Sequence, residues 1–271
     1  MSKARPLNGV VGSSERVVMV VGSYGSGKTE VAVNLALHLA KAGRTVQIAD
    51  LDLVNPYFRS REARRLMEDH GIRVVVPPGD QAYADLPIVL PEIRGMLNPP
   101  EGDVTLFDVG GDDVGAKALA AFRPVIHEGA YELWQVINER RPFTSTVEGC
   151  LRMQGEIQTA SRLTGTGLLA NTHLIEHTTP EVVLAGWHLA EKVAGRCGRP
   201  VRCVAVMEAI ADDPLLTEVR APVLRMQRTM LPPWIPGAAP TDDVQVPAAR
   251  STPIGKPPNV QFPRPRGERH G

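Results

Sequence analysis

An eight-residue run near the start of the chain has the residue types and spacing that bind the phosphates of a nucleotide. The run is Gly22-Ser23-Tyr24-Gly25-Ser26-Gly27-Lys28-Thr29, which matches the P-loop pattern G-x-x-x-x-G-K-[ST]. Its glycines let backbone N–H groups curl around an anion without Cβ clashes, and the helix that follows adds a positive dipole end. Lys28 suits the β- and γ-phosphates, and the Thr29 hydroxyl suits Mg²⁺. The sequence therefore predicts a nucleoside triphosphate site, and we count Glu30, the next residue, among its contacts.

Acidic residues follow two later apolar runs, at positions that suit magnesium and an attacking water. Asp50 and Asp52 stand two residues apart at the end of an expected strand, so both carboxylates can point the same way. One can meet Mg²⁺ or its water, while the other can orient a water at the γ-phosphate; the alternative is an exposed acidic loop. Asp108 ends the next such run, as expected of a magnesium-binding carboxylate, and Gly111 suits a backbone N–H that contacts the γ-phosphate.

Asn171 ends a further apolar run and is the candidate contact to the nucleobase, because an amide offers both a donor and an acceptor. The alternative is a turn residue that caps the strand. Recognition of guanine by the pattern N-K-x-D needs a carboxylate three residues after the asparagine, and Leu174 stands there. The missing acceptor favours ATP over GTP.

Strands and helices alternate along most of the chain. Apolar runs predict strands over 17–21, 45–50, 72–76, 104–109, 131–137, 167–171 and 201–207, of which the last is expected to be the final strand. Helical spacing predicts helices from residue 27 to about 42 and over 58–70, 92–97, 116–122, 145–163 and 180–194. This order predicts an α/β fold, a doubly wound and mostly parallel sheet with helices on both faces. Ligands bind such a sheet at the carboxyl ends of its strands, so we expect one rim to collect Gly22, Asp50, Asp108, Asn138 and Asn171.

The 271 residues suffice for one large domain and a tail. We expect a flexible leader over 1–15, a P-loop nucleotide-binding domain over 16–231 and an extended tail over 232–271, which holds ten of the 24 prolines. A tail that wraps its own domain or a partner chain is the alternative. The 30 Lys and Arg residues balance 30 Asp and Glu, which gives no electrostatic indication of nucleic-acid binding. Because no apolar run resembles a signal peptide or a membrane span, the expected location is the cytoplasm.

Together, the P-loop, Asp50-Leu51-Asp52 and Asp108-Val109-Gly110-Gly111 resemble the CobQ/CobB/MinD/ParA group of P-loop proteins, over roughly residues 16–207. The resemblance implies Mg²⁺-dependent ATP binding and, in many members, a nucleotide-dependent homodimer with slow hydrolysis. It also implies that Asp52 orients the lytic water, that Asp50 and Asp108 serve the magnesium, and that Asn171 contacts adenine. Many members of the MinD/ParA branch carry a signature lysine directly after the first P-loop glycine, where this chain has Ser23.

We predict a magnesium-dependent ATPase that switches partner binding, with Lys28, Asp50 and Asp52 carrying the chemistry. Gly111 and the loop over 50–55 would close on ATP and relax on ADP. One alternative is a small-molecule kinase or ATP-dependent ligase, similar to dethiobiotin synthetase or cobyrinate amidase, with an acceptor site built from 77–100 and 138–144. The other is a non-hydrolysing nucleotide-binding subunit of a larger enzyme.

Overall fold

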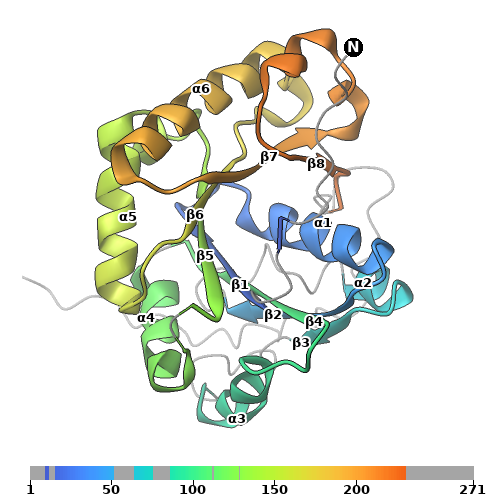
Figure 1. Ribbon diagram of the computed structural model, residues 1–271, viewed down its shortest axis with the longest axis vertical. Helices are drawn as coiled ribbons and strands as arrows, with labels where there is room; N and C mark the ends of the chain where they lie inside the picture. The colour runs from blue at the N-terminus through green and yellow to red at the C-terminus, as the bar shows by residue number, and fades with distance from the viewer. Residues whose placement is uncertain are drawn as a thin grey trace, which may run out of the picture. The chain divides into compact units, whose positions relative to one another are not determined.

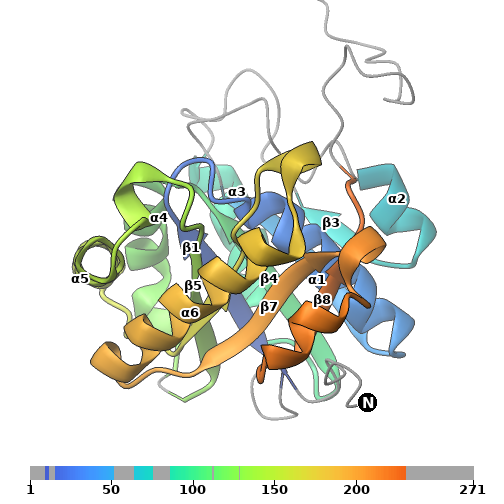
Figure 2. The ribbon, with the colours of Figure 1, turned by 90° about the horizontal axis from the view of Figure 1, so that it is seen from above.

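The computed structural model describes residues 10–11, 16–51, 64–75, 86–111, 113–127 and 129–229, except for the side chains of 86–90 and 113–114. The described part forms one sheet of eight strands with helices on both faces, shown in Figure 1 and, turned, in Figure 2. The strand order is β3-β2-β4-β1-β5-β6-β7-β8, and every neighbouring pair is parallel. The predicted doubly wound α/β fold is confirmed.

Most predicted elements are present within a few residues of their expected ends. The strands are β1 (Val17–Gly22), β2 (Thr45–Leu51), β3 (Arg73–Val75), β4 (Asp103–Val109), β5 (Tyr131–Ile137), β6 (Gly167–Ala170), β7 (Val201–Met207) and β8 (Val223–Met226). The α-helices are α1 (Lys28–Lys41), α2 (Arg64–Asp69), α3 (Leu86–Met96), α4 (Asp113–Phe122), α5 (Val147–Ser161) and α6 (Pro180–Cys197). Short 3₁₀ turns include η2 (Pro142–Thr144) and η3 (Ile175–His177).

Two predicted boundaries are wrong. The sheet does not end at β7, because β8 adds an eighth strand at its edge. The four residues of β8 are too few for a periodic signal, and Arg225 in the strand is exposed and paired with Glu208 at 2.8 Å. Helix α3 starts earlier than expected and continues through Pro91, a residue that normally ends a helical pattern. The part of the expected helix over 58–63 lies outside the described residues.

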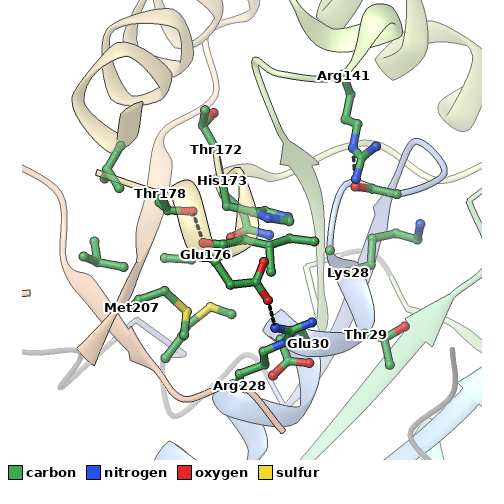
Figure 3. A pocket seen from close by; sticks show the side chains of 18 of the residues that line it. Lys28, Thr29, Glu30, Arg141, Thr172, His173, Glu176, Thr178, Met207 and Arg228 are labelled. Carbon is green, nitrogen blue, oxygen red and sulfur yellow. Dashed lines mark hydrogen bonds and ion pairs between the residues drawn. The ribbon is translucent and has the colours of Figure 1, made fainter. Parts of the chain in front are cut away.

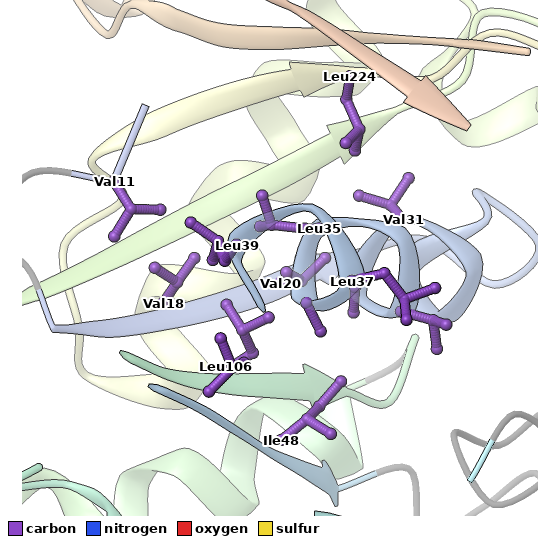
Figure 4. Packing of buried hydrophobic residues seen from close by; sticks show 14 of the residues in the cluster. Val11, Val18, Val20, Val31, Leu35, Leu37, Leu39, Ile48, Leu106 and Leu224 are labelled. Carbon is purple, nitrogen blue, oxygen red and sulfur yellow. The ribbon is translucent and has the colours of Figure 1, made fainter. Parts of the chain in front are cut away.

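The alternation of side chains along the central strand explains why both faces carry helices. On β1, Val18 and Val20 are buried in the cluster that α1 covers, together with Leu35 of that helix (Figure 4). Val17 and Met19 point the other way, into the cluster that contains residues of α3 and α4. Such strands read as continuous apolar runs because both faces are buried, which is the pattern of a parallel sheet.

Part of the predicted leader packs against the core. Within residues 1–15 the structure describes Val10 and Val11, which are 7% and 5% exposed and belong to the cluster around α1. These two apolar side chains gain from burial, so the segment is not loose at this point. The predicted tail over 232–271 lies outside the described residues. Among the described helices, none combines the length and the apolar character that crossing a membrane requires.

Candidate functional site

The P-loop connects the buried end of β1 to the first residue of α1. Two of its glycines, Gly25 and Gly27, have φ angles of 69° and 87°, in the left-handed region where a side chain is strained. The loop closes on itself, because the backbone N–H of Ser26 donates to the carbonyl of Ser23 at 3.2 Å. The ammonium of Lys28 donates to the same carbonyl at 3.0 Å, and this side chain is only 7% exposed. The loop therefore holds a buried cation beside a helix N-terminus, an arrangement that attracts anions.

Gly111 lies directly against this loop, where the sequence predicted a γ-phosphate contact. A Cβ added to Gly111 would stand 2.8 Å from the Lys28 ammonium and 2.8 Å from the backbone nitrogen of Tyr24. No side chain fits there without a shift of the P-loop. The tight approach explains the glycine and brings the segment after β4 within reach of whatever Lys28 binds.

Two buried carboxylates stand side by side at the same rim. Asp50 of β2 and Asp108 of β4 are partners in the parallel register, and each is 1% exposed. Thr29 begins α1 beside the P-loop and is partly buried. A hydroxyl and carboxylate oxygens are the hard ligands that Mg²⁺ prefers, so the donor set fits this ion. Asp52, the predicted water-orienting residue, lies outside the described residues.

Magnesium at such a site takes most of its remaining ligands from phosphates and water. Among the described residues, no group of three His, Cys, Asp or Glu side chains could hold a metal ion by itself.

Asn171 reaches the P-loop rather than standing free at the end of β6. Its side-chain amide nitrogen donates to the carbonyl of Ser26 at 2.8 Å, although 145 residues separate the two. A Cβ on Gly27 would stand 2.4 Å from the same nitrogen, so the loop and the amide are in close contact. One of the two N–H groups of this amide is used on the protein, so the second N–H and the Oδ1 acceptor remain for a ligand.

A cavity of 520 Å³ extends from the P-loop along the carboxyl ends of β6, β7 and β8 (Figure 3). One end is polar and includes Lys28, Thr29 and Glu30. The other end is apolar and is lined by Ile175, Val183, Ala205, Val206, Met207 and Met226. A polar end at a P-loop joined to an apolar recess matches the two halves of a nucleotide, its phosphates and its base.

A short segment after β8 forms one wall of the cavity. Asn34 of α1 holds it through both amide atoms, since Oδ1 accepts from the N–H of Gln227 at 2.8 Å and Nδ2 donates to its carbonyl at 3.0 Å. Glu30 accepts from the backbone N–H of Thr229 and, at 3.0 Å, from its hydroxyl. Arg228, between them, pairs with Glu176 of η3. Sequence reasoning missed this wall because it missed β8.

Two basic side chains, Arg141 and His173, also line the cavity. Arg141 donates from Nε to the carbonyl of Gly25 at 2.8 Å. Burial lowers the pKa of His173, and the positive charges of Arg141 and Arg228 lower it further, which keeps this imidazole neutral near pH 7. The sequence offered only their position after the ends of β5 and β6 as a signal.

No protein-family model matches this sequence. No curated protein sequence matches it either. Solved structures do match in three dimensions. The signal recognition particle 54 kDa protein of Aeropyrum pernix K1, in complex with GDP, superposes with a TM-score of 0.50 at 17% identity, over 70% of this chain and 41% of that one. The protein has the P-loop NTPase fold.

Two further matches have lower scores. The cell division protein FtsY of Thermotoga maritima gives a TM-score of 0.48 at 21% identity, over 70% of this chain and 61% of that one. A nucleotide-binding protein of Archaeoglobus fulgidus, in complex with ADP, gives 0.44 at 17% identity, over 78% and 88% of the two chains. The chain thus spans about two fifths of the signal recognition particle protein and three fifths of the FtsY structure.

Proposed function

We propose that this P-loop NTPase binds Mg²⁺ and ATP in the 520 Å³ cavity and hydrolyses ATP slowly to switch partner binding, as a member of the CobQ/CobB/MinD/ParA group. One observation carries the proposal. The buried Lys28 ammonium, the backbone of Gly111 and the start of the cavity meet at one point of the P-loop. A γ-phosphate bound there would contact both the cation and the segment after β4, which could then move on hydrolysis.

Each residue at the rim has a role in this proposal. The P-loop N–H groups and Lys28 bind the phosphates, and Gly111 contacts the γ-phosphate. Thr29, Asp50 and Asp108 would hold the magnesium, which neutralises phosphate charge when bound. Asp52 orients the attacking water. If Asp52→Ala hydrolysed ATP at the wild-type rate, the water-orienting role of Asp52 would be wrong.

The residue at position 174, where the guanine-specific pattern has its carboxylate, supports ATP rather than GTP. Guanine needs a carboxylate for its N1 and N2 hydrogens, and the described lining contains two, Glu30 and Glu176. Glu30 already accepts from Thr229, and Glu176 is paired with Arg228. Leu174 is 42% exposed at the position where the N-K-x-D pattern has its carboxylate. Adenine has no N1 hydrogen and therefore needs no carboxylate at position 174; its N6 amino group needs a single acceptor.

Turnover of ATP and of GTP by the purified protein with Mg²⁺, followed together with its mass by light scattering, tests the proposal. We expect ATP to be hydrolysed faster than GTP and the mass to double with ATP, since we also propose a nucleotide-dependent homodimer in the cytoplasm. Turnover that starts only when a small carboxylic acid is added would favour a kinase or ligase instead. Tight ATP binding with neither turnover nor dimer would contradict the switch as an activity of this chain alone.

Gly111→Ala is expected to weaken ATP binding by about tenfold, because overpacking of this kind costs on the order of 1–3 kcal/mol. The added Cβ meets the end of the Lys28 side chain, which can move, but it also meets the P-loop backbone at Tyr24, which cannot shift without moving the loop. Titration calorimetry with Mg·ATP measures the effect. Gly155→Ala is the matched control, because a Cβ at this exposed position of α5 has nothing within 4 Å and should leave affinity unchanged. Equal affinities for the two variants would show that the approach of Gly111 does not matter.

A further inference from the structure

Arg141 makes a long-range contact with the middle of the P-loop. It follows β5 by four residues, and its Nε donates to the carbonyl of Gly25 at 2.8 Å across 116 residues of sequence. The guanidinium lies flat enough against the loop that a Cβ on Gly25 would stand 3.1 Å from its central carbon. A glycine at position 25 therefore makes room for an arginine, and the side chain has a fixed place beside the phosphate loop (Figure 3).

The charge of Arg141 has no carboxylate partner among the described residues. Its neighbour Arg140 pairs with Glu139 at 3.0 Å, and Arg228 on the opposite side of the cavity pairs with Glu176. Arg141 instead bonds a neutral carbonyl through one of its five N–H groups. It is also partly buried and lies near His173, whose pKa it lowers. A partly desolvated cation without an anion is costly, unless a ligand supplies the anion.

We propose that Arg141 is a second cation that contacts the phosphates of the bound nucleotide, alongside Lys28. This inference rests on the proposed function. The Nε bond to Gly25 orients the guanidinium, which leaves the two terminal nitrogens of its fork for phosphate oxygens. The contact would supply from within the chain a positive charge near the loop position where Ser23 replaces the signature lysine.

The test is the affinity for ATP and for adenosine, measured by titration calorimetry and by displacement of ATP at millimolar adenosine. Arg141→Gln should weaken ATP binding by about 10- to 100-fold, the loss expected for a hydrogen-bonded charged pair. Its affinity for adenosine, which has no phosphate, should stay unchanged. Arg141→Lys should lose less affinity for ATP than Arg141→Gln, because lysine keeps the positive charge. It should still bind ATP more weakly than the wild type, because an ammonium cannot bond the Gly25 carbonyl and a phosphate through one rigid fork. Arg140→Gln is the matched control and should bind ATP as the wild type does.

Two results would overturn the inference. One is ATP binding by Arg141→Gln within twofold of the wild type. The other is an equal loss of affinity for ATP and for adenosine, which would place the side chain at the base or ribose. If Arg141→Gln does not fold, Arg141→Lys provides the test instead. Wild-type affinity for ATP in Arg141→Lys would contradict a phosphate contact through the guanidinium of Arg141. Failure of the wild-type protein to bind ATP would instead refute the proposed function. If Lys28→Ala lost affinity for ATP while Arg141→Gln kept it, only the role of Arg141 would be refuted.

Discussion

Lys28→Ala is expected to weaken Mg·ATP binding by about 100-fold, because loss of charge-assisted hydrogen bonds to phosphate costs on the order of 3 kcal/mol. The wild-type ammonium is buried beside Gly111 and already hydrogen-bonded to the loop, so it needs little reordering to meet phosphates. Preorganised charge of this kind also stabilises the transferring phosphoryl group, so turnover should fall by at least about 100-fold. Calorimetry and a phosphate-release assay measure the two effects.

Lys41→Ala provides the control within the same helix. Lys41 is the last residue of α1 and is exposed, at the end of the helix away from the P-loop. The substitution removes the same charge and the same side-chain type, so a general effect of net charge would appear in both variants. If the two bind ATP equally well, Lys28 is not the phosphate-binding lysine and the cavity is not the nucleotide site.

The sequence predicted the fold well because the sheet is parallel and buried. The strand over 131–137 was located to the residue, since its seven residues are all buried and all but Glu132 and Gln135 are apolar. The P-loop was located by its local pattern, which is complete within eight residues. Parallel pairing then brought Asp50 and Asp108 together at one rim, as expected for the carboxyl ends of neighbouring strands.

The rest of the site depends on contacts that no local pattern encodes. Arg141 meets Gly25 across 116 residues, and Asn34 meets Gln227 across 193. Neither pair has a period or a motif, so both appear only once the sheet is assembled. The same limit explains β8, a four-residue edge strand that is defined by pairing with β7 rather than by its own sequence. The motif thus located the P-loop, while tertiary contacts form the wall and the recess.

A buried ionic cluster at the opposite end of the sheet was also invisible to motif reasoning. Glu132, near the start of β5, is 2% exposed. It accepts from the indole nitrogen of Trp134 at 2.6 Å, from the hydroxyl of Thr166 and from the guanidinium of Arg202 on β7. Strand β6 lies between β5 and β7, and a Cβ on its Gly167 would stand 2.5 Å from the Arg202 side chain. The glycine thus lets Arg202 cross β6 to reach the carboxylate.

Glu132→Ala is expected to lower the free energy of unfolding by about 3 kcal/mol, because removing one partner leaves a buried polar group and a cation without their acceptor. The value is at the low end for buried pairs, since the Arg202 side chain is 27% exposed and water can solvate part of it. Urea unfolding measures the change. Glu92→Ala is the control, because the pair that Glu92 forms with Arg73 at 2.6 Å is about half exposed on both sides and should contribute less than about 1 kcal/mol.

The position of the cluster separates this loss of stability from any loss of function. Glu132 is the second residue of β5, whereas the rim that carries the P-loop follows the last residue of this strand, about 17 Å further along at the rise of a strand. Glu132→Ala should therefore bind Mg·ATP normally at temperatures where it is folded. If Glu132→Ala lost no more free energy of unfolding than Glu92→Ala, the cost of burying the Glu132 carboxylate would equal the gain from its hydrogen bonds and ion pair. In that case Glu132→Leu combined with Arg202→Leu should match or exceed the wild-type stability, as found when apolar residues replace a whole buried ion pair.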